Sequence, residues 1–348
     1  MSTAYSVAEA NFEVAAPEIC RLWAANLDGL SPSIIDAKLQ LGYLHNPSGP
    51  GVGVLLKLQG QSDPVGVVCL QPRRAVFGGQ RIGIATLSDF AVDETHRTLG
   101  PAVMLMRHAV AIARERFDFT IGLPNQRSAA VCRRAGLHCI GTIDRYAKVL
   151  ASRPFLAKHV PPLLVRVLAP MADIALVVAD RIRGALMRPA LRMNLTTFDD
   201  PAIDAIWAQA PTDHVLSDRS CAMVRWRYGL AGRGEWQICI ARGPDAAPLG
   251  FVVWRLMQGA ADVGDFFSFD PARLTKPLMH AFSLHARRHG ASSVGLRFFG
   301  SDAAEAGLRD AGYKVRLRDR QVFIDARDIQ GTESKDRWYL TAFDNDAN

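Results

Sequence analysis

Several features that would direct a protein to a particular class are missing from these 348 residues. No cysteine belongs to a C-x-x-C pair, and the six cysteines lie scattered among apolar neighbours, at Cys20, Cys69, Cys132, Cys139, Cys221 and Cys239. This pattern argues against a disulfide framework and against a zinc site. The first eleven residues hold neither a basic stretch nor an apolar run, so no secretory signal is expected. We therefore expect a cytoplasmic protein with reduced thiols and no metal.

Low-complexity and disordered composition are also absent. Apolar residues make up 49% of the chain and charged residues 22%, which is typical of a globular protein. A length of 348 residues exceeds what a single hydrophobic core usually serves. The composition therefore predicts two domains of similar size.

A broad basic surface is missing as well, although the formal net charge is +7. Between Arg153 and Arg192 the chain holds seven basic residues and only two acidic ones, Asp173 and Asp180. This segment carries most of the excess charge, and the remainder is close to neutral. A face that binds nucleic acid is therefore not expected.

The first part of the chain alternates between helix and strand signals. Pro17 and Pro32 suit the first turns of helices near 17–27 and 31–43. Strands are predicted at 52–58, 65–70 and 81–92, separated by turns that contain glycine or proline. A helix at 100–116, a strand at 119–123, a helix at 125–135 and a strand at 137–149 follow. This order predicts a mixed α/β fold.

Residues 160–188 form the longest apolar-rich stretch, with apolar residues recurring at intervals of three and four, the period of one helix face. Charged residues such as Arg166 and Asp173 interrupt the stretch, which argues against a membrane-spanning helix. One interpretation is a helix that packs between two domains. The alternative is a basic amphipathic helix that lies on the inner, anionic face of a membrane.

From about residue 194 the order of elements restarts. One helix is predicted to open at Pro201, another to run from a cap at Ser217 to Arg227, and two more to span 274–289 and 301–311. Strands are predicted at 236–241, 249–256, 263–269, 292–299 and 313–325. A constant offset of 176, without gaps, places identical residues on each other, namely Asp89 on Asp265, Arg97 on Arg273, Pro101 on Pro277 and Gly136 on Gly312. The repeat predicts an internal duplication. We assign one domain to 1–150, a basic amphipathic helical linker to 151–192 and a second domain to 193–348.

The strongest local signal follows the strand that ends at Val92 and opens the next helix. It consists of Arg97, Thr98, Leu99, Gly100, Pro101 and Ala102. A helix N-terminus offers unpaired N–H groups and the positive end of the helix dipole, which suits a pyrophosphate. Gly100 allows a close backbone approach, and Arg97 adds a forked cationic donor. The alternative is an ordinary turn between a strand and a helix.

A second segment begins at Asn125, after the strand that ends at Leu123, and continues through Ala129 and Cys132 to Gly136. Gly136 suits a left-handed helix C-terminus. Asn125 has two interpretations, a cap of the following helix or a contact to the amide of a ligand.

The stretch from Asn11 to Leu150 resembles an acyltransferase domain of the GNAT superfamily. Residues 97–102 stand at the R/Q-x-x-G-x-G/A loop of that family, and residues 125–137 have the spacing of its N-x-x-A segment. The resemblance implies that acyl-CoA lies between the strands that end at Val92 and Leu123. Val92, the loop 97–102 and Asn125 would contact it, and an amine acceptor would attack the thioester directly.

The resemblance also implies three candidate catalytic residues. The tyrosine that often protonates the departing thiolate in this family falls at Cys132 here, and Tyr146 on the next strand is a reserve candidate. Asp89 is the best-placed carboxylate for a general base. Each has a structural alternative: helix packing for Cys132, a strand side chain for Tyr146, and a salt bridge for Asp89.

In the second half the gap-free offset puts Lys276 at the place of Gly100 and Leu278 at the place of Ala102. Side chains there would fill the space of a pyrophosphate, so we expect a degenerate, noncatalytic half. The sequence thus predicts an acyl-CoA-dependent N-acyltransferase, with acetyl as the expected group, in cell-envelope or polysaccharide metabolism. The alternatives are a Fem-like aminoacyl transferase and a noncatalytic adaptor at the membrane surface.

Overall fold

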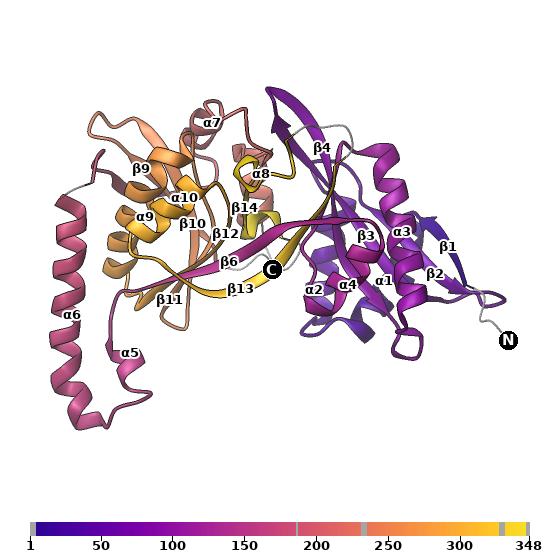
Figure 1. Ribbon diagram of the computed structural model, residues 1–348, viewed down its shortest axis with the longest axis horizontal. Coiled ribbons are helices and arrows are strands. Elements are labelled where there is room, and N and C mark those ends of the chain that lie inside the picture. Colours follow the sequence, from indigo (N-terminus) through magenta and orange to yellow (C-terminus); the bar gives the residue numbers. More distant parts are fainter. Residues whose placement is uncertain (1–4, 186, 231–234, 327–330, 346–348) are drawn as a thin grey trace.

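The computed structural model describes residues 5–185, 187–230, 235–326 and 331–345. Two α/β halves lie side by side along the longest axis of the molecule (Figure 1). We call residues 5–149 the first half and residues 192–345 the second half. Residue 186, at the end of the predicted 160–188 helix, lies outside the described residues.

The first half closely follows the predicted order of elements. Its helices are α1 (Phe12–Asn26), α2 (Pro32–Ala37), α3 (Leu99–Arg116) and α4 (Gln126–Arg134), with a π-helical segment η1 at Lys38–Leu44 and a 3-10 turn η2 at Glu94–His96. Its strands are β1 (Tyr5–Ala10), β2 (Val52–Leu58), β3 (Pro64–Phe77), β4 (Gln80–Val92), β5 (Phe119–Gly122) and β6 (His138–Val149).

Two predictions about the start of the chain are wrong. Helix α1 begins five residues before Pro17, because the side chain of Asn11 accepts the N–H of Glu13 and caps the helix there. Pro17 therefore lies inside α1. The helix predicted at 31–43 is capped by Ser31 as expected but changes to π-helical geometry at Lys38. Strand β1 was not predicted.

The second half begins after α5 (Arg153–Leu156) and the long helix α6 (Pro162–Ala185). Its helical segments are α7 (Ala202–Trp207), α8 (Cys221–Val224), η3 (Arg225–Gly229), α9 (Pro271–Arg288), α10 (Asp302–Asp310), η4 (Lys335–Arg337) and η5 (Ala342–Asp344). Its strands are β7 (Arg192–Thr196), β8 (Leu216–Ser217), β9 (Gln237–Arg242), β10 (Pro248–Met257), β11 (Ala260–Ser268), β12 (Ser293–Gly300), β13 (Lys314–Ala326) and β14 (Tyr339–Thr341). The helix predicted to start at Ser217 is wrong in its start, since Ser217 lies in β8 and Ser220 is the N-cap residue of α8.

All strands belong to one 14-stranded sheet whose main path runs β1-β2-β3-β4-β5-β13-β6-β12-β11-β10-β9-β7. Strand β13 of the second half lies between β5 and β6, and β6 of the first half lies between β13 and β12, in antiparallel pairs. In Figure 1 these two strands cross the middle of the molecule together. The last strand of each half therefore extends the sheet of the other half. The assignment of domains to 1–150 and 193–348 stays a prediction, and the sheet itself has no break at residue 150.

The order strand-strand-strand-helix-strand-helix-strand occurs twice, as β2 to β6 with α3 and α4 and as β9 to β13 with α9 and α10. Helices α3 and α9 both have 18 residues. The segment before α3 spans 93–98, whereas only residues 269 and 270 separate β11 from α9. Arg97 therefore precedes its helix while Arg273 and Pro277 lie inside theirs, so the gap-free register of the predicted duplication is wrong here.

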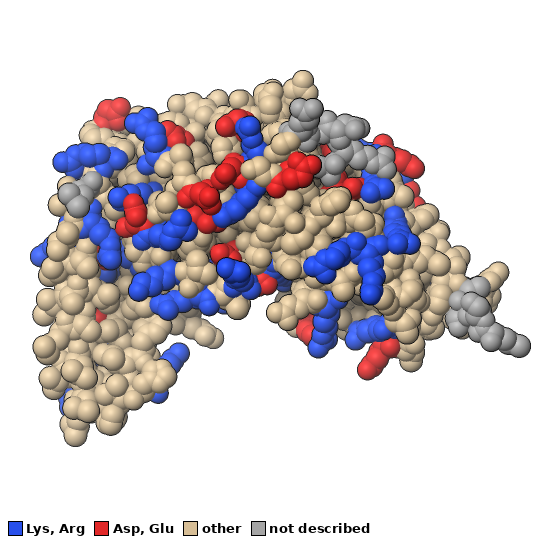
Figure 2. Space-filling view, viewed as in Figure 1, with Lys and Arg blue, Asp and Glu red and all other residues tan. Residues whose placement is uncertain are grey.

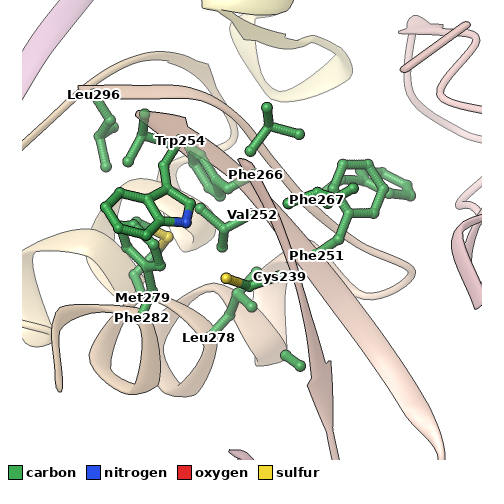
Figure 3. Close-up of a cluster of buried hydrophobic side chains, with 14 of the residues drawn as sticks. Cys239, Phe251, Val252, Trp254, Phe266, Phe267, Leu278, Met279, Phe282 and Leu296 are labelled. Carbon is green, nitrogen blue, oxygen red and sulfur yellow. The ribbon is translucent and has the colours of Figure 1, made fainter. Parts of the chain in front are cut away.

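Hydrophobic cores lie on the faces of the sheet that the helices cover. In the second half, α9 contributes Leu278, Met279 and Phe282 to a cluster with Trp254 and Phe251 from β10 (Figure 3). In the first half, α3 covers one sheet face and α1 with η1 covers the other. Packing on both faces fixes β4 between helices, and this strand forms one wall of the cavity described next.

Candidate functional site

A cavity of about 420 Å³ opens where β4 and β5 separate. The two strands pair in parallel from Ile84↔Phe119 to Leu87↔Gly122. The cavity lies just beyond this last pair, where the strands are no longer hydrogen-bonded to each other. Its walls come from the α1–α2 loop, η1, β4, the segment from β5 into α4, and β13. The lining residues include Asp28, Lys38, Ser88, Asp89, Phe90, Leu123, Asn125, Ser128, Cys132 and Arg320. The predicted gap between the strands that end at Val92 and Leu123 thus exists as an open space.

A β-bulge shapes the β4 wall of this cavity. Cys69 of β3 faces Ser88 and Val67 faces Ala91, so two residues, Asp89 and Phe90, stand opposite Val68 alone. Asp89 has a φ of 50°, a left-handed conformation that aspartate tolerates better than most residues. Bulges interrupt the ladder and re-aim backbone and side-chain groups, and they are common beside active sites.

Asp89 is buried and both of its carboxylate oxygens have partners. Lys38 donates from Nζ to Oδ1 at 2.7 Å, and the hydroxyl of Tyr43 donates to Oδ2. Lys38 and Tyr43 both come from the π-helical segment η1, a placement that no sequence signal marked. The structural alternative, a salt bridge, is therefore present, while Asp89 also lines the cavity.

The second half repeats this arrangement with different residues. Asp265 is fully buried in an ion pair with Arg219, whose Nε lies 3.0 Å from Oδ2, and accepts from the hydroxyl of Thr341 at 2.6 Å. Burial raises the pKa of Asp265 to about 6, against the opposing attraction of Arg219. A buried carboxylate held by a cation is thus a common feature of both halves.

The two proposed proton donors lie in different places. Cys132 lines the cavity, and burial raises the pKa of its thiol to about 12, which makes it a weak acid at neutral pH. Tyr146 lies in the hydrophobic core of the second half, where its strand pairs at Leu296 and Val315. Burial raises the pKa of Tyr146 well above its ordinary value. The placement of Tyr146 at the cleft is therefore wrong, because β6 leaves the first half at that point.

The N-terminus of α3 is bare. Thr98 is the N-cap residue, but its side chain makes no capping bond. Within the described part of the chain, no hydrogen-bond acceptor contacts the N–H groups of Leu99 and Gly100. A Cβ added at Gly100 would meet no atom within 4 Å, and the next two residues, Pro101 and Ala102, are buried. These observations fit an anion such as a diphosphate.

Arg97 supports this loop from the side. Its Nε donates to the carbonyl of Val92 at 2.7 Å, and its Nη2 donates to Oδ1 of Asn26 at 2.8 Å. Asn26 in turn donates to Asp93 at 2.7 Å, which links the loop to the end of α1. Arg97 also lines a neighbouring depression together with Arg127, so its exposed guanidinium adds positive charge beside the bare helix end.

The corresponding helix of the second half is closed instead. Asp270 is the N-cap residue of α9 and its side chain accepts the N–H of Arg273 at 3.1 Å. A carboxylate of the chain itself therefore occupies the positive end of that helix. Lys276 and Leu278, predicted to fill the pyrophosphate space, lie beyond the first turn of α9, so they are not the residues that close it.

Asn125 has the role of a cap. Its Oδ1 accepts the N–H of Ser128 at 3.0 Å and the hydroxyl of Ser128 at 3.1 Å, and α4 starts directly after it. Its side chain is exposed and also lines the cavity. The cap interpretation is thus confirmed by geometry, and a contact to a ligand stays a prediction.

Arg320 was missed by sequence reasoning. It comes from β13 of the second half and donates from Nη1 to the carbonyl of Leu123 at 3.2 Å. It lines both the 420 Å³ cavity and a second cavity of about 520 Å³ on the second half, which also contains Arg145, Arg255 and Arg297. Only the exchange of β6 and β13 brings Arg320 here, so no local pattern could have revealed it. Among the described residues, no group of three or more His, Cys, Asp and Glu side chains is placed to hold a metal ion.

Comparison with known proteins gives three findings. Residues 19–137 match the sequence model of the acetyltransferase (GNAT) family. No curated protein sequence matches the chain. Solved structures match it over almost its whole length.

Several of these structures are described as acyltransferases or acetyltransferases. A probable N-acyltransferase from Enterococcus faecalis has a TM-score of 0.65 at 13% identity and covers 93% of this chain and 73% of its own. A GCN5-related N-acetyltransferase from Anabaena variabilis has a TM-score of 0.64 at 13% identity and covers 93% of this chain and 73% of its own. A third, the Saccharomyces cerevisiae N-myristoyltransferase with bound myristoyl-CoA, has a TM-score of 0.54 at 10% identity and covers 94% of this chain and 80% of its own. At such identities the likeness establishes a shared fold.

Proposed function

Because residues 19–137 match the sequence model of the acetyltransferase (GNAT) family, we propose that the protein transfers an acyl group from acyl-CoA to an amine acceptor. Acetyl is the expected group. The fold is that of acyl-CoA-dependent transferases, one of which binds myristoyl-CoA, and this supports the donor class. The proposed acceptor is a primary amine.

The bare N-terminus of α3 is the observation that carries the proposal. The N–H groups of Leu99 and Gly100 and the exposed guanidinium of Arg97 would hold the diphosphate of acyl-CoA. The acyl-pantetheine arm would then enter the 420 Å³ cavity between β4 and β5. The second half, whose corresponding helix is capped by Asp270, has no such seat and would act as a scaffold.

The chemistry is direct attack of the amine nitrogen on the thioester carbon. The C–N bond forms, the C–S bond breaks, the nitrogen loses a proton and the thiolate gains one. Most of the rate would come from holding the two reactants together, with backbone groups at the β4 bulge polarising the carbonyl. Asp89 is the carboxylate in the cavity wall that would attract the ammonium form of the acceptor and receive its proton. Cys132, whose pKa is raised to about 12, would serve as packing and not as the acid.

The alternatives differ in what they require of the chain. A Fem-like transfer of an amino acid from tRNA needs no diphosphate seat at the end of α3. A noncatalytic adaptor needs neither the seat nor the open cavity. Binding of acyl-CoA by the purified protein therefore separates the proposal from both.

The test is isothermal titration of the protein with acetyl-CoA. We expect the wild type to bind with a micromolar Kd and Gly100→Trp to show no binding, because the indole would occupy the space above the N–H groups. Gly100 is exposed and has open space around its Cβ position, so the substitution leaves the fold intact.

A matched control exists in the second half. Ala272 is also exposed and, like Gly100 in α3, is the second residue of its helix. Ala272→Trp should bind acetyl-CoA as the wild type does. Equal binding by Gly100→Trp and wild type, or no binding by the wild type, would end the assignment of the diphosphate seat.

A further inference from the structure

Helix α6 presents an apolar face to solvent. Large apolar side chains that recur at intervals of three and four are 42% to 77% exposed, which is unusual for such residues in a folded domain. We call this set the α6 apolar face: Leu163, Leu164, Val167, Leu168, Met171, Ile174, Val178 and Ile182. The helix stands at the edge of the molecule farthest from the first half (Figure 1).

The opposite side of α6 is attached to the protein. Val165 and Ala169 are buried, and Asp173 follows them at the same spacing of four, so these residues share one side of the helix. Asp173 accepts the N–H of Ser152 at 2.6 Å, and the hydroxyl of Ser152 donates to the carbonyl of Ala169 at 3.1 Å. The helix therefore cannot turn its apolar face inward without breaking these contacts.

The same side carries a buried ion-pair cluster farther along α6. Asp180 is 2.9 Å from Nζ of Lys148 and 2.7 Å from Nη2 of Arg287. Close to this cluster, Gly184 of α6 packs against His280 of α9. The approach is so close that a Cβ at position 184 would lie 2.9 Å from Nε2 of His280. Contacts at both ends of the helix thus hold its orientation.

The charge around the apolar face is of one sign. The acidic residues of the segment, Asp173 and Asp180, both point to the protein side and are engaged there. Arg183 forms an ion pair with Asp180 on the protein side. The other basic residues of the segment are exposed: Arg153, Lys158, Arg166, Arg181, Arg188 and Arg192. In Figure 2 the lower left end of the molecule, formed by α5 and α6, is mostly uncharged. A few basic side chains and little acidic surface are visible there.

We propose that α6 lies flat on an anionic lipid surface, with its apolar face in the boundary between headgroups and acyl chains. An apolar face bordered by cations and free of exposed carboxylates matches that environment. Its 24 residues, about 36 Å of helix, provide a long contact line. This inference is independent of the proposed transferase activity.

Two other uses of the face fit less well. The helix is long and apolar enough to cross a membrane, and 11% of its most apolar stretch is buried. A crossing would require it to leave the contacts of Asp173 and Asp180, which removes a buried carboxylate from its cations. A second copy of the chain would bring two basic clusters together, because a two-fold interface places the same surface on both sides. Anionic lipid instead neutralises that charge.

The test is flotation of the full-length protein with vesicles. We expect the wild type to float with vesicles of phosphatidylcholine and phosphatidylglycerol in a 1:1 ratio. About 50% anionic lipid is enough for a polybasic contact. Binding to vesicles of phosphatidylcholine alone should be at least about tenfold weaker. The variant Leu163→Gln, Met171→Gln, Ile174→Gln should lose most of the binding to anionic vesicles. These three side chains are exposed, so their replacement leaves the core unchanged.

The control variant carries the same number of changes at exposed apolar residues elsewhere, Val14→Gln, Leu195→Gln, Leu317→Gln, and should float as the wild type does. Absence of flotation by the wild type, or equal flotation by both variants, would overturn the proposal. So would a wild-type dimer in light scattering that the α6 variant converts to a monomer, since the face would then pair with itself. Retention on vesicles after extraction at alkaline pH would overturn the flat orientation in favour of a crossing helix.

Discussion

Asp89 combines three unusual properties in one residue. It has a left-handed backbone at a bulge, it is buried, and it is held by a lysine and a tyrosine from η1. A left-handed conformation in a residue other than glycine costs about 1 kcal/mol or more, and such strain is concentrated at functional sites. Its counterpart Asp265 is also buried and ion-paired but has no positive φ. The strained conformation thus distinguishes the half that has the open cavity and the bare helix end.

We predict that Asp89→Asn lowers both activity and stability. Asparagine tolerates the left-handed region and has almost the same shape, so the change removes the charge and replaces one acceptor oxygen by a donor amide group. Lys38 then loses its anionic partner, which should cost about 1 to 3 kcal/mol in the free energy of unfolding. If Asp89 accepts the proton of the amine, kcat should fall about 100-fold or more.

The control is Asp265→Asn, which removes a carboxylate from the corresponding buried pair in the second half. It should lower the melting temperature strongly but leave kcat per folded molecule unchanged. An Asp89→Asn enzyme with the kcat of the wild type would show that this carboxylate is structural only.

At the scale of the element, α6 depends on very few contacts. Most of its surface faces solvent, and its C-terminal part is fixed by Asp180 with Lys148 and Arg287. Burial acts to raise the pKa of Asp180, but the attraction of the two cations prevails and leaves it below its ordinary value. Burial lowers the pKa of Lys148. The ion pair is therefore buried on both sides, and loss of one member leaves a charge without compensation.

We predict that Asp180→Asn lowers the free energy of unfolding of the protein by about 3 to 5 kcal/mol, measured by denaturant titration. Asp199→Asn is the matched control, because its ion pair with Arg225 is exposed and should contribute less than about 1 kcal/mol. The pKa of Asp180 is lower in the folded state than its unfolded value of about 3.9. The ionised carboxylate therefore stabilises the fold at neutral pH, and this stabilisation is lost as the pH falls below the unfolded value and through the lower pKa of the folded state. Equal effects of the two substitutions would contradict this account.

The whole molecule is held together by exchange of the terminal strands. Strand β13 pairs with β5 from Phe323↔Gly122 to Ala326↔Phe119, and Arg114 of α3 forms an ion pair with Asp325. The halves also meet where Nε1 of Trp226 donates to the carbonyl of Leu41 at 2.8 Å. Residues 1–150 alone would therefore lack one neighbour of β5 and both neighbours of β6. Such unpaired strand edges favour aggregation.

We predict that a fragment of residues 1–150 does not fold on its own. It should elute as an aggregate in size-exclusion chromatography and melt without a cooperative transition, whereas co-expression with residues 151–348 should restore a soluble 1:1 complex. A monomeric fragment with a cooperative melt and micromolar binding of acetyl-CoA would show that the first half is autonomous despite the exchange.

The sequence by itself determined what depends on neighbouring residues. Strand β2 has the predicted bounds of residues 52–58, and α3, α4 and β6 lie within one residue of theirs, because hydrophobic period, turn residues and caps act over short distances. The loop at 97–102 and the apolar stripe of α6 were equally visible, since both are properties of one helix and the residues before it.

Only the tertiary structure decided which strands share an edge, and the remaining findings follow from that. Tyr146 lies in the core of the other half, Arg320 reaches the cavity from β13, and Lys38 and Tyr43 bind Asp89 across about fifty residues of sequence. The different lengths of the loops before α3 and α9 likewise moved Arg273 out of the position of Arg97. Pairing between distant segments is selected by the packing of the complete sheet, and no local pattern encodes it.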